Sequence, residues 1–106
     1  MRTKRYNKLV RDKIPQIIEA DGKSCTTEIL SNEEYIKMLD EKLNEELLEY
    51  QESKAVEELA DILEVMDAIA TARGYSQETV ERIRKQKADK RGKFKKKILL
   101  KEVIED

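Results

Sequence analysis

The chain has 106 residues, of which 42% are charged and 39% are hydrophobic, with one Pro and three Gly. This balance is typical of a single helical domain, here residues 1–106. The 22 basic residues nearly balance the 23 acidic ones, and aromatic residues make up 5%, which disfavours a nucleic acid as partner. No apolar run approaches the roughly 20 residues that span a bilayer, so no membrane is expected. The charged N-terminus lacks the hydrophobic stretch of a signal peptide, which predicts a cytoplasmic protein.

The first third of the chain predicts a basic arm, a short helix and a strand. Residues 1–13 form the arm, which is partly extended. Pro15 then opens a short helix that Gly22 ends. The segment 26–30 has two Thr, an Ile and a Leu around one charged residue, which predicts a short strand.

Two long helices come next. Ser31 is a good N-cap and Glu34 completes a capping box, so a helix is predicted from there to about Ser53. A second helix is predicted over 54–73, ended by Gly74. Because the connection is very short, the pair should form an antiparallel hairpin.

The C-terminal third predicts one further helix and an ambiguous segment. Ser76 can cap a helix that reaches about Lys90, with Gly92 as its terminator. The apolar residues near 97–103 fit either a strand that pairs with 26–30 or a last helix, and periodicity does not decide between the two.

Four acidic residues interrupt the apolar faces of the predicted hairpin. A rotation of about 100° per residue places Glu46 inside the apolar arc of the first helix and Glu49 at its margin. On the second helix, Glu58 lies within the apolar arc and Asp61 just past its edge, whereas Glu45 is expected on the solvated side of the first helix. Because the turn is short, the two pairs should face each other.

Four converging carboxylates need compensation. An unpartnered buried carboxylate costs several kcal/mol, so the pattern predicts a bound cation among Glu46, Glu49, Glu58 and Asp61. The chain has no His and one Cys, which argues against zinc and against a Glu-x-x-His di-iron site. Oxygen ligands favour magnesium, with manganese as the alternative.

Basic residues that follow and precede the predicted hairpin in the sequence are candidates for binding phosphate. Lys87 takes the place of the next apolar residue after Val80 and Ile83, and Arg91 lies on the same side of that helix. These two could bind phosphates or simply offset the dipole at the helix C-terminus. The arm residues Lys8, Arg11 and Lys13 are likewise either substrate contacts or solvated charges.

Three sequence blocks resemble one family. Glu45-Glu46-Leu47-Leu48-Glu49 followed by Glu58-Leu59-Ala60-Asp61 resembles the EExxE and ExxD signature of MazG-like all-α nucleoside triphosphate pyrophosphohydrolases, relatives of phosphoribosyl-ATP pyrophosphohydrolase and all-α dUTPases. The runs from Tyr6 to Pro15 and from Lys87 to Phe94 resemble the ends of the short stand-alone branch.

The resemblance implies a function and a set of ligands. It implies magnesium-dependent hydrolysis of a nucleoside triphosphate to the monophosphate and pyrophosphate, as in house-cleaning of nucleotide pools. Glu46, Glu49, Glu58 and Asp61 match the metal-binding and catalytic acids, and Lys87 and Arg91 match phosphate-contacting residues of some members. Only eight residues separate Glu49 from Glu58, a shorter spacer than in many MazG proteins, so a nucleobase pocket near the turn should be reduced or supplied by another subunit.

One hairpin cannot cover both of its apolar arcs. We therefore expect an all-α hairpin that pairs with a second copy into a four-helix bundle, as a homodimer or a tetramer. The alternative to an enzyme is a helical interaction module whose acidic seam binds a basic partner without metal.

Overall fold

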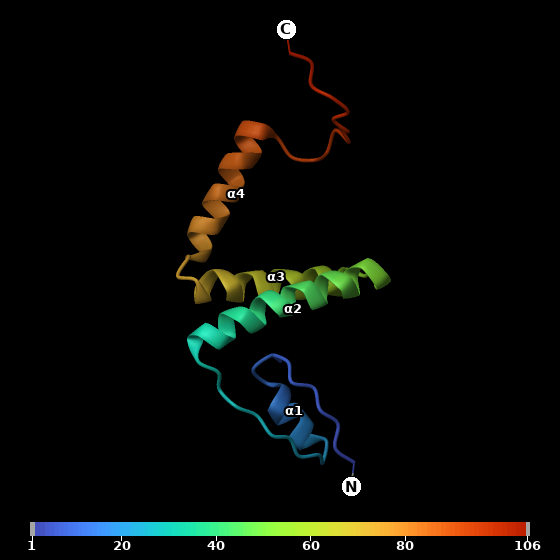
Figure 1. Cartoon of the computed structure of the whole chain (residues 1–106), viewed down its shortest axis with the longest axis vertical. Coiled ribbons are helices and arrows are strands. Elements are labelled where there is room, and N and C mark those ends of the chain that lie inside the picture. Colours follow the sequence, from blue (N-terminus) through green and yellow to red (C-terminus); the bar gives the residue numbers. More distant parts are fainter. Residues whose placement is uncertain (1, 106) are drawn as a thin grey trace. The chain divides into compact units, whose positions relative to one another are not determined.

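The structure is a computed structural model that describes residues 2–105, and over that range it has four α-helices and no β-strand (Figure 1). The helices are α1 (Ile14–Ala20), α2 (Asn32–Ser53), α3 (Val56–Ala72) and α4 (Gln77–Arg91). The chain divides between Tyr75 and Ser76 into two units. The predicted all-α class is confirmed.

Local capping sets the bounds of α2. The Oγ of Ser31 accepts a hydrogen bond from the Glu34 N–H at 3.2 Å, which confirms the predicted N-cap. The Glu34 carboxylate accepts from the Ser31 hydroxyl at 3.3 Å instead of reaching the cap's backbone N–H, so half of the capping box forms. At the other end, Lys54 adopts a left-handed conformation (φ 58°) and α2 stops at Ser53.

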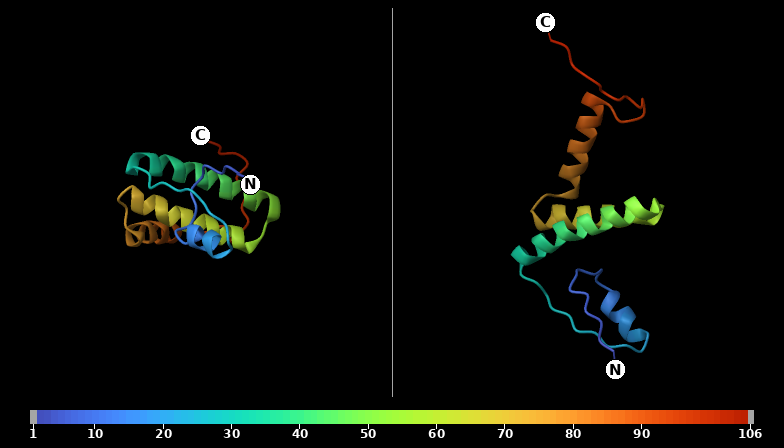
Figure 2. Two further views of the ribbon diagram at one scale, coloured as in Figure 1. Left: turned by 90° about the horizontal axis from the view of Figure 1, so that it is seen from below. Right: turned by 45° about the vertical axis from the view of Figure 1, so that its right-hand side comes forward.

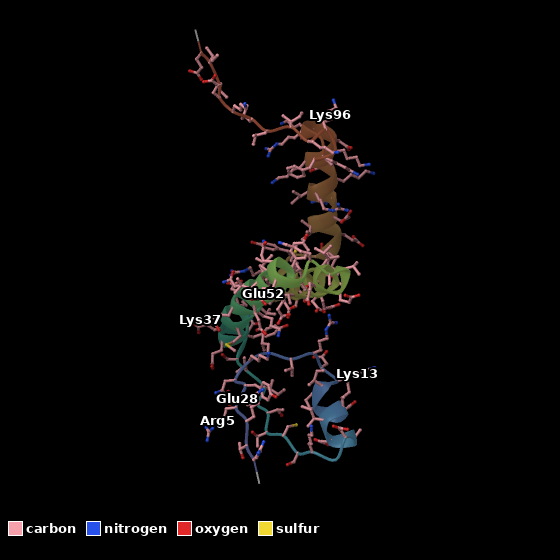
Figure 3. The ribbon with its side chains drawn as sticks, turned by 90° about the vertical axis from the view of Figure 1, so that its right-hand side faces the viewer. Arg5, Lys13, Glu28, Lys37, Glu52 and Lys96 are labelled. Atoms are coloured by element: carbon pink, nitrogen blue, oxygen red, sulfur yellow. The ribbon has the colours of Figure 1, made fainter. Side chains whose placement is uncertain are left out.

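The turn between α2 and α3 consists of Lys54 and Ala55. Ala55 is extended, so α3 begins at Val56, two residues later than predicted. The two helices pack against each other, side by side in two views (Figures 1 and 2), as the predicted antiparallel hairpin. Leu39 of α2 and Ala70 of α3 are buried, and charged side chains such as Lys37 and Glu52 lie on the exposed surface of α2 (Figure 3).

A stripe of large apolar side chains on α3 remains exposed within the first unit. Its spacing of three or four residues places the side chains along one face of the helix. The stripe consists of Val56, Leu59, Leu63 and Met66, of which Leu63 is 62% exposed. The hairpin therefore leaves apolar surface uncovered, as the sequence predicts.

In the second unit, α4 has the predicted ends. The Oγ of Ser76 accepts from the Thr79 N–H at 3.1 Å and caps the helix. Gly92, with φ 84°, ends it after Arg91.

Both strand predictions are wrong. Residues 26–30 and 97–103 form no ladder, and the latter segment is not a last helix either. Most of their apolar side chains are exposed to solvent: Ile29 is 98% exposed, and Ile98, Leu99 and Leu100 are exposed as well, whereas Leu30 is half-buried. A β-rich composition yields a strand only where a second strand offers hydrogen-bond partners, and within residues 2–105 no strand forms to offer them. Within residues 2–105, no helix is both long and apolar enough to cross a membrane.

Candidate metal centre

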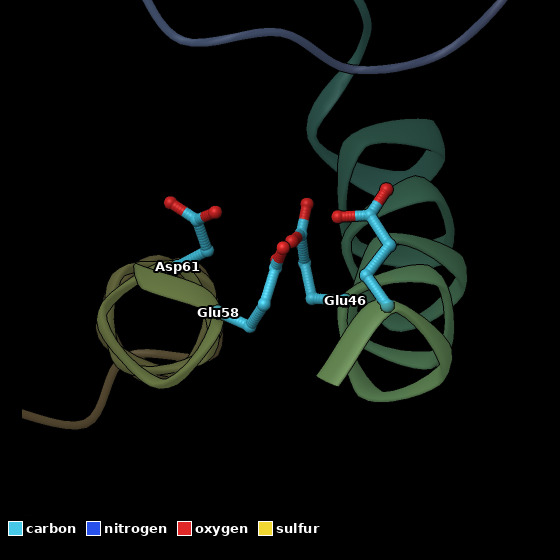
Figure 4. A group of neighbouring side chains, drawn as sticks. Glu46, Glu58 and Asp61 are labelled. Atoms are coloured by element: carbon cyan, nitrogen blue, oxygen red, sulfur yellow. The ribbon is translucent and has the colours of Figure 1, made fainter. Parts of the chain in front are cut away.

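Four carboxylates from α2 and α3 converge at one point of the hairpin. One oxygen from each of Glu46, Glu49, Glu58 and Asp61 lies within 4.8 Å of the others. Figure 4 shows the carboxylates of Glu46 and Glu58 meeting between the two helices, with the Asp61 carboxylate beside them above α3. We call these four residues the acid cluster. The convergence predicted from the helical periodicity is thus present in the fold.

The inner oxygens of the acid cluster lack partners. Glu46 is 6% exposed, although it is ionisable. The Oε2 atoms of Glu46 and Glu58 are buried and accept no hydrogen bond from residues 2–105. Native proteins seldom leave a buried oxygen in this state, because its desolvation costs free energy that no protein contact returns. Both orphaned atoms belong to the predicted ligand set.

Two of these carboxyls hold their protons unusually tightly. Burial, followed by the negative charge of Glu49, raises the pKa of Glu46 above its ordinary value, and Lys42 opposes the shift in part. Desolvation and the charges of Glu49 and Asp61 raise the pKa of Glu58. In each case the charged form is disfavoured because negative groups are crowded in a poorly solvated place.

Lys42 is a cation of the site that the sequence reasoning missed. Its Nζ lies 3.5 Å from Oε1 of Glu45 and 3.5 Å from Oε1 of Glu46, and its side chain is 19% exposed. It therefore contacts the outer oxygen of Glu46 and leaves Oε2 free. The spacing in the sequence could have predicted this contact, because Lys42 precedes Glu46 by four residues, about one helical turn.

Glu45 is less solvated than predicted. Its side chain is 32% exposed and lies between Lys8 and Lys42, both of which donate hydrogen bonds to Oε1, at 3.1 and 3.5 Å. Burial works against its charged form, but the hydrogen bond from Lys8 and the charge of Lys42 leave the pKa of Glu45 below its ordinary value. The same hydrogen bond raises the pKa of Lys8. The helical wheel could not show this, because Lys8 reaches Glu45 from another part of the chain.

The structure places the other predicted cations differently. Arg11 lies beside the acid cluster and donates to Asp61 at 2.7 Å. Lys13 is the N-cap of α1 and forms no ion pair with any residue between 2 and 105. Lys87 and Arg91 lie one turn apart on the exposed surface of α4, in the second unit, so their contact with a ligand remains a prediction.

The acid cluster has the chemistry of a divalent-cation site. Its donors are all carboxylate oxygens, the ligands preferred by magnesium, manganese and calcium. Opposite oxygens in a magnesium shell are about 4 Å apart, so side-chain shifts of less than about 1 Å would close the 4.8 Å spread. A cation here would also supply the partner that the inner oxygens of Glu46 and Glu58 lack. These residues could hold a metal ion.

Comparison with known proteins finds a partial match. No protein-family model matches the chain, and no solved structure matches it. An uncharacterized protein of Mycolicibacterium smegmatis is 49% identical over 41 residues, which is 39% of this chain and 42% of the relative. The matched region thus spans less than half of either protein.

Proposed function

We propose that the protein is a magnesium-dependent pyrophosphohydrolase that converts a nucleoside triphosphate to the monophosphate and pyrophosphate. The observation that carries the proposal is the convergence of four carboxylates within 4.8 Å, two of them with buried, unpartnered oxygens. The sequence resemblance to MazG-like enzymes supports the reaction type, because its acidic signature falls on these same four residues. Manganese is the expected substitute for magnesium.

The chain supplies groups for binding and for proton transfer. Glu46, Glu49, Glu58 and Asp61 would hold the cation, which supplies positive charge against the phosphate oxygens when bound. A carboxylate in or next to the acid cluster takes the proton of the attacking water. Water then forms a bond to phosphorus, the phosphoanhydride bond breaks, and pyrophosphate leaves. Lys8, Arg11, Lys13, Lys87 and Arg91 are the candidates for holding the phosphates.

The same proposal includes a second copy of the chain. The exposed stripe of α3 is apolar surface that a partner hairpin would cover in a four-helix bundle, as a dimer or a tetramer. Light scattering at micromolar concentration measures this directly. A stable monomer would contradict the bundle and leave the chemistry of the acid cluster untouched.

Pyrophosphate release tests the reaction. A panel of canonical and modified nucleoside triphosphates is incubated with the protein and magnesium or manganese. We expect release from at least one of them, and loss of release in Glu58→Gln. The matched control is Glu57→Gln, which removes the neighbouring charge on the exposed side of α3 and should retain turnover.

The alternative function, a helical interaction module, predicts no dependence on metal. An interaction module with an acidic seam would bind no magnesium in the presence of nucleotide, and a chelator would not change its melting. Calorimetry that shows neither metal binding nor turnover with any substrate of the panel would replace the enzyme with this alternative.

A further inference from the structure

The N-terminal arm, residues 2–12, contacts both helices of the hairpin beside the acid cluster. Lys8 donates to Glu45 of α2 at 3.1 Å, and Arg11 donates to Asp61 of α3 at 2.7 Å. The two cations are three residues apart in the arm, whereas their partners belong to different helices. In Figure 4 a segment of the arm passes over the side of the acid cluster toward which the Asp61 carboxylate points. The arm therefore spans the hairpin at the proposed site.

Arg11 forms an ion pair with one of the proposed metal ligands, Asp61. Its guanidinium contacts Oδ1 of Asp61, and a second nitrogen lies 3.9 Å from Glu64. A guanidinium and a divalent cation satisfy the same need of a carboxylate, which is positive charge at its oxygens. The inner oxygens of Glu46 and Glu58 receive no such contact. Positive charge from the arm thus compensates the rim of the acid cluster and leaves its interior open.

We propose that Arg11 is a positioning residue that changes partner during the reaction cycle. In the metal-free protein it holds Asp61. When a divalent cation binds the acid cluster, Asp61 turns to the cation and Arg11 is released to contact the phosphates of the substrate. This inference rests on the proposed function, because it needs both the metal and an anionic ligand. It adds a coupling in which metal binding makes the arm available for the substrate.

The size of the effect follows from the exposure of the pair. The side chains of Arg11 and Asp61 are 58% and 38% exposed, so solvent screens their attraction. Ion pairs of this kind contribute up to about fivefold to an equilibrium constant. Arg11 should therefore weaken metal binding by no more than about this factor, which leaves the metal able to displace it.

Metal affinity in the absence of nucleotide tests the exchange. Magnesium is titrated calorimetrically into the full chain and into the variants Arg11→Gln and Arg5→Gln. Arg5 lies on the same arm, is exposed (Figure 3), and forms no ion pair with residues 2–105, so it controls for the loss of one positive charge. We expect Arg11→Gln to bind magnesium about two- to fivefold more tightly than Arg5→Gln. Equal affinities would overturn the proposal.

A second readout follows the side chain itself. Nitrogen NMR of the arginine guanidinium groups reports whether rotation is hindered by an ion pair, and Arg11→Gln identifies the Arg11 signal. Saturating magnesium should speed the rotation of the Arg11 group, and subsequent addition of inorganic triphosphate should slow it again. If saturating magnesium leaves the rotation of the Arg11 guanidinium unchanged, the proposed change of partner is refuted. If the wild-type chain binds no divalent cation at all, the proposed function fails first, and the two failures are therefore distinguishable.

Discussion

Glu46→Gln is predicted to stabilise the metal-free protein and to remove most of the stabilisation that metal binding supplies. Glu46 is almost fully buried, and its carboxylate lies within 4.8 Å of three others. At an effective dielectric constant of about 20, each such neighbour repels it by about 3 kcal/mol. Lys42, at 3.5 Å, offsets roughly one of these repulsions. Because solvent screens part of this repulsion, as at the 38% exposed side chain of Asp61, we expect the uncharged amide to stabilise the metal-free fold by about 1 to 3 kcal/mol.

Thermal melting in chelator and in excess magnesium measures both effects. For a domain of this size, 1 kcal/mol corresponds to about 4–8 °C in Tm. In chelator the variant should melt at a higher temperature than the wild type. Magnesium at about 100 times its Kd should stabilise the wild type by about 2.7 kcal/mol and the variant far less. Glu41→Gln, an exposed change on the same helix, should match the wild type in both conditions.

The pH dependence gives an independent check of the same reasoning. The pKa of Glu46 is raised in the folded state, so the folded protein binds the proton more tightly than the unfolded chain does. The charged Glu46 carboxylate therefore destabilises the metal-free fold fully at a pH above its raised pKa. This destabilisation disappears as the pH falls toward the ordinary pKa of 4.5. The advantage of Glu46→Gln in chelator should therefore shrink on acidification. A variant that melts below the wild type at neutral pH without metal would refute the electrostatic argument.

Three further changes probe other parts of the hairpin. Lys42→Met should destabilise the metal-free protein by about 1 to 3 kcal/mol in denaturant melts, because it leaves the Glu46 charge uncompensated, while exposed Lys37→Met should have little effect. Equal effects of the two changes would show that Lys42 is an ordinary surface residue. Leu63→Glu should convert a bundle to monomers in light scattering without altering the helical circular dichroism of the hairpin; an unchanged mass would exclude the α3 stripe as the interface. Lys54→Gly should stabilise the turn by about 0.5 to 1 kcal/mol, because glycine adopts a positive φ without strain, and a lower Tm would refute this.

The helices and the acid cluster were predictable from sequence because local rules determine them. Ser31 and Ser76 cap helices through contacts with residues three positions away, and Gly92 ends one through its own φ. The cluster follows from helical periodicity plus a short turn. Lys42 was predictable on the same basis, since Glu46 lies one turn further along its helix.

Features that depend on contacts between segments distant in the sequence could not be predicted from helical periodicity and capping. The segment 26–30 has the composition of a strand, but a strand needs a partner strand, and the composition did not reveal that none forms in the described range 2–105. The contact of Arg11 with Asp61 joins residues 50 positions apart. Periodicity within one helix carries no information on where an extended segment crosses a different helix. The sequence therefore identified the arm residues as candidate substrate contacts but did not predict their position beside the acid cluster.

The spacing of the four acids about the turn has a consequence for insertions and deletions. Glu49 lies four residues before Ser53 and Glu58 four after Lys54, and Glu46 and Asp61 lie seven residues out on the two sides. In an antiparallel hairpin, residues equally far from the turn share a level along the helix axes. A single residue added between Val56 and Glu58 would shift one half of the quartet by about 1.5 Å and 100° relative to the other. The two-residue connection thus sets the level of one acid pair against the other, and a single residue inserted into α3 before Glu58 should disperse the acid cluster.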